Sequence, residues 1–194
     1  MTQRGKFIII LGPTGSGKSV LLNYIHERFP ELVFSTSYTT REKRPGQENT
    51  SYTFVSKEEF EERIASGGFL EYAAYGANYY GTPKEEILEA LAEGKILIKE
   101  MEVQGVRQVR EQMPGDLVLI YIDAGSWEEL ERRVRARAPI SDEEMEKRKK
   151  RYADELPFKE VADFVVANPP GKLEEAQEAL KTAISTVTGL SPRA

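Results

Sequence analysis

The chain has 194 residues, 40% of them hydrophobic and 30% charged, so it holds enough apolar material for one α/β core and too little length for two large independent domains. The composition excludes a disordered chain. The absence of cysteine excludes disulfides, thiol catalysis and a cysteine-bound zinc site, and a net charge of −5 argues against a general nucleic-acid-binding surface.

Apolar runs along the chain predict strands that alternate with helices. Residues 7–11 form a short, continuous apolar run followed by glycine, a pattern typical of a buried parallel strand. Further strands are expected at residues 33–36, 69–73, 96–101, 117–123 and 164–167. Parallel pairing through crossover helices predicts a three-layer α/β sandwich, with its ligand crevice at the carboxyl ends of the strands.

Several helices have explicit start signals in the sequence. A serine or threonine followed three residues later by glutamate is typical of a capping box, and a proline suits the first helical position. The pairs are Ser56 with Glu59, Thr82 with Glu85, Ser126 with Glu129 and Ser141 with Glu144, and the proline is Pro83.

Neither the apolar runs nor the basic residues of the sequence indicate a membrane or nucleic-acid partner. Residues 1–6 contain no long apolar segment, and the run at 7–11 is too short to cross a bilayer, so a cytoplasmic location is expected. The basic run at 147–151 follows several acidic residues, which favours a solvated helix face with ion pairs.

The first strand is followed by a glycine-rich motif that binds phosphates. Residues 12–19 match G-x-x-x-x-G-K-[ST] between a strand and an amphipathic segment, the context that such a loop requires. Backbone N–H groups and the helix N-terminus bind phosphate, Lys18 can reach the β and γ phosphates, and the Ser19 hydroxyl is the expected Mg²⁺ ligand. The predicted ATP-binding residues of the loop are Gly12, Pro13, Thr14, Gly15, Ser16, Gly17, Lys18 and Ser19.

A second phosphate site is predicted in the aromatic, turn-rich segment that interrupts the strand-helix alternation. Arg41 and Arg44 are three residues apart beside several hydroxyl groups, and guanidinium groups bind phosphate oxygens in bidentate fashion. An ordinary surface loop has the same composition, so this cluster alone leaves both interpretations open.

Four segments resemble those of guanylate kinases in their order and spacing, namely residues 37–46, 51–55, 69–72 and 78–83. The resemblance extends over about residues 6–184. It implies that Arg41, Arg44, Tyr52 and Tyr80 hold the GMP phosphate. It also implies that Ser37, Glu71 and Thr82 contact the guanine base. A carboxylate accepts from N1–H and the 2-amino group, and a hydroxyl can donate to O6.

Glu100 and Glu102 end the predicted strand at 96–101, and the period of two places both on one face near the crevice. Guanylate kinases have aspartates at both positions, where they help to organise the magnesium shell and contact the guanine amino group. Each glutamate moves its carboxylate outward by roughly 1.5 Å. Reduced activity or a shifted base preference is therefore a hypothesis for this chain.

The resemblance also assigns residues near the transferring phosphoryl group. Arg133, Arg137 and Arg148 match arginines that stabilise its charge, with solvated helix charges as the alternative. Between them, residues 137–140 read Arg-Ala-Pro-Ile instead of the family's Arg-Gly-Thr-Glu, so the turn is expected to be stiffer. Asn168 is expected to approach the adenine of ATP.

The sequence leaves three functions open. The leading one is Mg²⁺-dependent transfer of the ATP γ-phosphoryl group to GMP or dGMP. The others are a P-loop kinase for another phosphorylated small molecule and a protein-binding module without catalysis.

The expected organisation is one domain, residues 1–194, as a monomer or homodimer. It comprises a core (1–33, 95–135 and 149–194), a GMP-binding lobe (34–94) and a lid (136–148).

Overall fold

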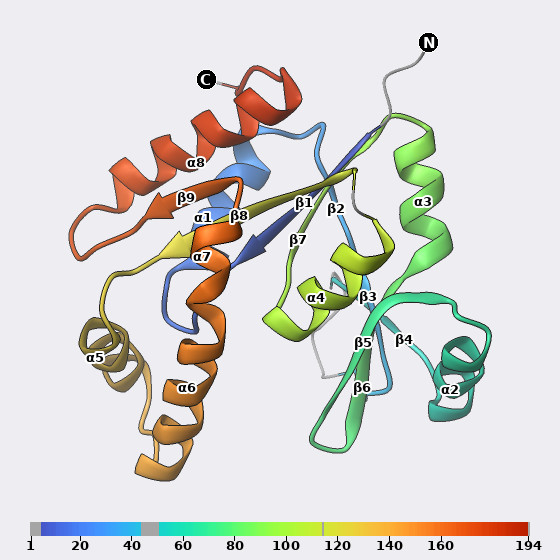
Figure 1. Cartoon of the computed structure of the whole chain (residues 1–194), viewed down its shortest axis with the longest axis horizontal. Coiled ribbons are helices and arrows are strands. Elements are labelled where there is room, and N and C mark those ends of the chain that lie inside the picture. The colour runs from blue at the N-terminus through green and yellow to red at the C-terminus, as the bar shows by residue number, and fades with distance from the viewer. Residues whose placement is uncertain (1–4, 44–50, 114, 194) are drawn as a thin grey trace. The chain divides into compact units, whose positions relative to one another are not determined.

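The computed structural model describes residues 5–43, 51–113 and 115–193. The chain folds as two compact units, and Figure 1 labels their elements in chain order. The first unit is made of Met1–Ile8, Leu32–Lys99 and Gln104–Leu117, and the second of Ile9–Glu31, Glu100–Val103 and Val118–Ala194. Strand β1 (Lys6–Leu11) begins in the first unit and ends in the second.

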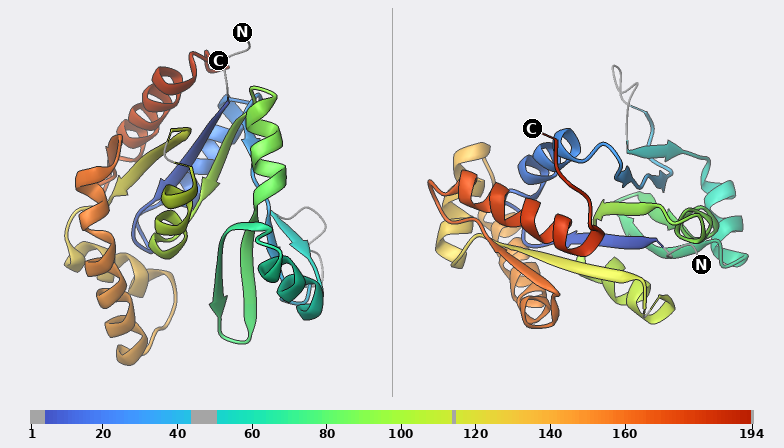
Figure 2. Two further views of the ribbon diagram at one scale, coloured as in Figure 1. Left: turned by 45° about the vertical axis from the view of Figure 1, so that its right-hand side comes forward. Right: turned by 90° about the horizontal axis from the view of Figure 1, so that it is seen from above.

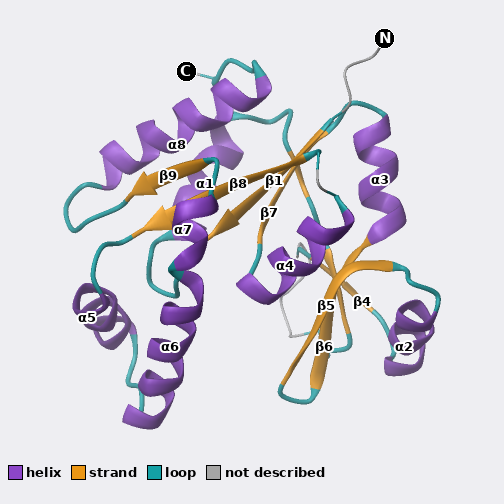
Figure 3. Ribbon diagram, viewed as in Figure 1, coloured by secondary structure: helices purple, strands orange, loops and turns teal. Residues whose placement is uncertain are grey.

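Among the described residues, five strands form the central sheet, and Figure 3 shows them alternating with helices along the chain. Their order is β2 (Val33–Phe34), β7 (Ile96–Glu100), β1, β8 (Leu117–Asp123) and β9 (Phe164–Ala167). Strands β2 and β7 pair in parallel, as do β8 and β9. Every side chain from Phe7 to Leu11 in β1 is fully buried. The predicted α/β class with a parallel central sheet is confirmed.

The first unit contains a second, mixed sheet in the segment that interrupts the alternation. Its order is β4 (Tyr52–Phe54), β3 (Ser37–Thr39), β6 (Asn78–Pro83) and β5 (Phe69–Tyr75). Strand β3 pairs in parallel with β4 and antiparallel with β6, while β5 and β6 form the antiparallel hairpin seen in Figure 2. Helices α2 (Lys57–Ala65) and α3 (Lys84–Ala92) belong to the same unit, as does α4 (Val103–Gln112) after its first residue.

Aromatic packing fixes the course of β6 in this sheet. The rings of Phe60 and Phe69 stack with centroids 4.4 Å apart, and Tyr38 meets Phe69 edge-on. A Cβ atom at Gly81 would lie 2.9 Å from the Phe69 ring, closer than real Cβ contacts allow. Glycine at this position therefore lets β6 pass against the rings, with Tyr80 and Thr82 on either side of it.

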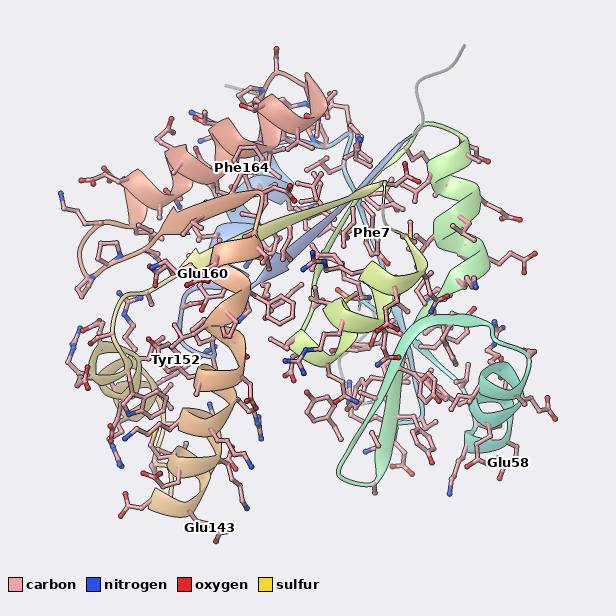
Figure 4. The ribbon with its side chains drawn as sticks, viewed as in Figure 1. Phe7, Glu58, Glu143, Tyr152, Glu160 and Phe164 are labelled. Carbon is pink, nitrogen blue, oxygen red and sulfur yellow. The ribbon has the colours of Figure 1, made fainter. Side chains whose placement is uncertain are left out.

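The second unit contains α1 (Lys18–Arg28), α5 (Trp127–Arg137), α6 (Asp142–Glu155), α7 (Pro157–Val161) and α8 (Leu173–Thr188). The ring of Tyr152, labelled in Figure 4, lies 5.7 Å from that of Trp127 and joins α6 to α5. After α8, the backbone N–H of Arg193 donates to the carbonyl of Arg28 at the end of α1. In the part of the chain that the structure describes, no helix is long and apolar enough to span a bilayer.

Candidate active site

The phosphate-binding motif forms the connection between β1 and α1. Gly17 caps the N-terminus of α1 with a φ of 96°, in the left-handed region that favours glycine. A Cβ atom there would also lie 2.4 Å from Nδ2 of Asn168. That nitrogen donates to the backbone carbonyl of Ser16 at 2.7 Å, and both residues are buried. Asn168, which immediately follows β9, thus supports the backbone of the loop.

Lys18 lies along the loop and reaches an acidic side chain at the end of β7. Its Nζ donates to the carbonyl oxygens of Gly12 at 2.5 Å and Pro13 at 3.2 Å. The same nitrogen lies 3.4 Å from Oε1 of Glu100, while the Ser19 hydroxyl donates to Oε2 of Glu100 at 3.4 Å. One carboxylate therefore contacts both the lysine and the hydroxyl of the motif.

The three predicted arginines gather around one cavity with the loop. This cavity, of about 530 Å³, is lined by Thr14, Gly15 and residues of α5 and α6 that include Arg133, Arg137 and Arg148. Guanidinium groups that line one cavity with a phosphate-binding loop can stabilise the charge of a transferring phosphoryl group.

Two of these arginines already have partners. Arg133 Nε lies 2.6 Å from Oε1 of Glu129, and its NH2 donates to the carbonyl of Asn168 at 2.9 Å. Arg148 pairs with Glu144 at 3.2 Å. Hydrogen bonds from Arg132 and Arg133 hold the pKa of Glu129 well below its usual value. These pairs fix the guanidinium groups before a substrate arrives.

Arg133 also lines a smaller cavity of about 330 Å³. Gly17, Val20, Arg133, Asn168 and Leu173 are among the residues that line it. It combines apolar walls with guanidinium and amide groups, a combination common in small-molecule sites. The amide nitrogen of Asn168 is engaged by Ser16, so its contribution to this cavity comes from the remainder of the side chain and from the backbone.

In the first unit, a buried carboxylate is paired with a hydroxyl across the β5–β6 hairpin. Glu71 and Thr82 lie opposite each other in the register, and the Thr82 hydroxyl donates to Oε1 of Glu71 at 2.5 Å. Thr82 is fully buried and Glu71 is 9% exposed. A buried carboxylate is stable only when it is hydrogen-bonded, and its lone pairs allow several donors at once.

Ser37, at the start of β3, contacts a buried lysine of β7. Lys99 Nζ donates to the Ser37 hydroxyl at 2.6 Å and to the carbonyl of Thr36 at 3.1 Å. Burial lowers the pKa of Lys99 to about 8, and the Glu71 carboxylate opposes this change. The lysine is thus linked to two of the predicted base-contacting residues.

Arg41, Tyr52 and Tyr80 are grouped on the same sheet. The guanidinium carbon of Arg41 lies 5.7 Å from the Tyr52 ring and 5.5 Å from the Phe54 ring. Tyr52 and Tyr80 meet edge-to-face with centroids 5.9 Å apart. The NH1 group of Arg41 also donates to the carbonyl of Glu42 at 2.9 Å. Arg44, the other predicted phosphate ligand, lies outside the described residues.

Comparison with known proteins decides the family. Residues 4–187 match the family model described as guanylate kinase. This chain belongs to the guanylate kinase family. A protein of Nostoc sp. named guanylate kinase is 42% identical over 181 residues, 93% of this chain and 89% of that protein, and one of Trichormus variabilis with the same name is 40% identical with the same coverage.

A solved structure supports the same assignment. The crystal structure of guanylate kinase from Anaplasma phagocytophilum has a TM-score of 0.70 and 26% identity, and the match covers 96% of this chain and 88% of that one. The predicted family resemblance and kinase class are confirmed.

Two predictions are wrong, one about the end of β7 and one about the start of α3. Strand β7 ends at Glu100, so Glu102 lies beyond the strand, in the link to α4, and does not share a strand face with Glu100. Thr82 does not cap α3, because its hydroxyl donates to Glu71 and the N-cap residue is Pro83. Pro83 therefore precedes the first helical position.

Sequence analysis missed Lys99 and Glu155. Lys99 interrupts an apolar strand, and a charged residue at a buried strand position is a signal for a polar partner. Glu155 continues a stripe with Met145, Arg148 and Tyr152 at spacings of three and four along α6, which marks it as facing inward. Burial raises the pKa of Glu155 to about 7, with Lys18 acting against the shift and Glu102 adding to it.

Proposed function

We propose that this guanylate kinase transfers the γ-phosphoryl group of ATP to GMP or dGMP, forming ADP and GDP or dGDP, in purine nucleotide metabolism in the cytoplasm. No covalent intermediate is needed, because the reaction consists of in-line displacement between two bound nucleotides. The partners are the two nucleotides, without nucleic acid or membrane, and the protein acts as a monomer or homodimer.

The observation that carries the choice of GMP is the buried pair of Glu71 and Thr82. A buried carboxylate selects a ligand with adjacent donors, and guanine offers both N1–H and the 2-amino group. Adenine has an acceptor at N1, so it would leave the carboxylate facing a lone pair. A site built on such hydrogen bonds rejects a mismatched analogue by roughly 10⁴-fold.

The proposed roles on the donor side follow from contacts within the second unit. Lys18 and the loop amides hold the ATP phosphates, and Arg133, Arg137 and Arg148 stabilise the transferred group. Asn168 supports the ATP-binding loop through Ser16.

On the acceptor side, Arg41, Arg44, Tyr52 and Tyr80 are proposed to hold the GMP phosphate, with Ser37 at the base. Glu102 stays proposed as a contact of the guanine amino group. The division into a core, a lobe at 34–94 and a lid at 136–148 is likewise proposed.

The donor set beside Lys18 fits Mg²⁺. Ser19 Oγ and Glu100 Oε2 are hard oxygen donors only 3.4 Å apart, and Mg²⁺ in phosphoryl-transfer sites binds few protein ligands while retaining water. We propose that Ser19 holds the ion directly and that Glu100 orients its water shell. When bound, Mg²⁺ neutralises charge on the β and γ phosphates.

A coupled ADP-release assay with GMP, dGMP, AMP, CMP and UMP tests this function. The expected result is a kcat/KM for GMP at least about 10³-fold above that for AMP. The Lys18→Met variant serves as a control for contaminating kinases and should lose at least about 10²-fold in kcat. ADP formation with none of the nucleotides, despite measurable GMP binding, would favour a binding module instead.

A further inference from the structure

The buried Lys99 makes a hydrogen bond that determines whether the neighbouring Ser37 hydroxyl acts as a donor or as an acceptor. Its side chain is 8% exposed on a strand whose preceding residues, Leu97 and Ile98, are buried and apolar. It makes hydrogen bonds to the Thr36 carbonyl and, at 2.6 Å, to the Ser37 hydroxyl. An apolar side chain would fill the same space without the cost of burying an amine, so the bond to Ser37 requires an explanation.

An ammonium group donates and cannot accept, whereas a hydroxyl has one proton and two lone pairs. Because Ser37 Oγ accepts from Lys99, its own proton is directed away from the lysine and toward another acceptor. Ser37 is therefore held as a donor. A hydroxyl without such a partner could rotate and accept a hydrogen bond instead.

We propose that Lys99 is a positioning residue for base selection, which holds the Ser37 hydroxyl as a donor to the oxo group at position 6 of a 6-oxopurine nucleotide. This inference rests on the proposed GMP kinase activity. With adenine, the 6-amino group would bring a second donor against the Ser37 proton. The mismatch disfavours AMP at an atom that Glu71 does not contact.

Glu71 complements Ser37 in this arrangement. Its carboxylate is an acceptor, already paired with the Thr82 hydroxyl, and it interacts electrostatically with Lys99. Lys99 thus connects a residue held as a donor on β3 with an acceptor on β5. One fixed donor and one fixed acceptor match O6 and N1–H of guanine and match neither corresponding group of adenine.

The test compares the parent with Lys99→Met, Ser37→Ala and the double variant. GMP, inosine monophosphate and AMP are the acceptors. For Lys99→Met we expect a rise of about tenfold in KM for GMP, with the KM for ATP unchanged. Inosine monophosphate should lose activity by the same factor as GMP because it has the same 6-oxo group. The preference for GMP over AMP in kcat/KM should fall about tenfold.

The double variant tests whether Lys99 acts through Ser37. In the Ser37→Ala background, Lys99→Met should change the KM for GMP less than twofold, because the hydroxyl to be oriented is gone. An equal further loss there, or an unchanged KM and base preference in the single Lys99→Met variant, would refute the inference. If the methionine variant does not fold, Lys99→Leu is measured in the same way.

Two controls separate this inference from the proposed function. Lys95→Met replaces an exposed lysine whose ion-pair partner is Glu93, and it should leave every constant unchanged. A parent protein that does not phosphorylate GMP would overturn the proposed function itself. A parent that phosphorylates GMP with its preference over AMP intact in Lys99→Met would overturn only the role of Lys99.

Discussion

At the scale of single residues, Thr82 supports the carboxylate proposed to bind the base, because its hydroxyl donates to the buried Glu71. Thr82→Val keeps the shape and removes the donor, which leaves the carboxylate with weaker support in its position. We expect the KM for GMP to rise about tenfold with little change in the KM for ATP. Thr82→Ser, which keeps the hydroxyl, should stay within about threefold of the parent, and equal losses in both variants would contradict the hydrogen-bond explanation.

Glu100 offers a second residue-scale prediction because one carboxylate contacts Lys18 and Ser19. Glu100→Gln removes the charge and preserves the size. We expect kcat to fall at least about tenfold and half-maximal activity to require more Mg²⁺. Steady-state rates across a magnesium titration measure both quantities. Glu93→Gln, which alters an exposed carboxylate, is the matched control, and an unchanged magnesium dependence in Glu100→Gln would exclude the proposed role.

The residues that sequence analysis proposed either have chemistry that is visible in a short motif or match positions in the guanylate kinase pattern. Lys18 follows a glycine loop, and Arg41 stands among hydroxyl groups. Lys99 and Glu155 carry no such motif, since their importance comes from burial beside side chains that are distant in the sequence. A charged residue on an apolar strand or an inward-facing helix stripe is the available signal, and it indicates burial without naming the partner.

At the scale of elements, the N-terminal caps of α6 and α5 can be compared with each other. Ser141 begins α6, and its Oγ accepts from the backbone N–H of Glu144 at 3.2 Å. Ser126 begins α5 but makes no side-chain cap bond within the described part of the chain. Ser141→Ala should lower the free energy of unfolding by about 1 kcal/mol, and Ser126→Ala by less than about 0.5 kcal/mol. Urea unfolding with unchanged m-values measures both, and equal losses would argue against the assigned cap.

The same comparison explains which helix starts were predictable. The serine caps at Ser56 and Ser141 are confirmed by bonds from the backbone N–H groups three residues later. At Ser126 the expected partner Glu129 is engaged by Arg132 and Arg133, and the hydroxyl of Thr82 is engaged by Glu71. At Thr82 a tertiary partner outcompeted the local motif, which a local pattern cannot anticipate, whereas at Ser126 the competing arginines lie three and four residues after Glu129 in the same helix.

At the scale of the whole molecule, the central sheet was predictable, whereas only β5 of the smaller sheet was. Strands β8 and β9 have the bounds that their apolar runs predict. Strands β3 and β4 have only three residues each, too few for a periodic pattern, and they pair in parallel, an arrangement that depends on the intervening chain. Packing on Phe60 and Phe69, more than local preference, determines that sheet.

A whole-molecule property, stability as a function of pH, follows from Glu155. Its carboxyl is buried, and Oε2 has no hydrogen-bond partner among the described residues. Lys18 and Arg151 favour the charged form, but burial dominates, with Glu102 and Asp154 adding to its effect, and raises the pKa from 4.5 to about 7. A raised carboxyl pKa means that the folded state binds the proton more tightly than the unfolded state. The associated stability is complete below about pH 4.5 and is lost as the pH rises through 7.

Glu155→Gln keeps a neutral side chain of similar size at every pH, so the variant should not lose stability as the pH rises through 7. Relative to the parent, the unfolding free energy of the variant should therefore increase between pH 5 and pH 8.5, by up to about 3 kcal/mol for a shift of about 2.5 pKa units. Urea unfolding of both proteins at the two pH values gives the difference directly. Glu160→Gln changes an exposed carboxyl of α7, labelled in Figure 4, and should show no such increase. A difference between Glu155→Gln and the parent that stays constant with pH would mean that the buried carboxyl keeps its charge through electrostatic attraction to Lys18 and Arg151, and that burial does not govern its protonation.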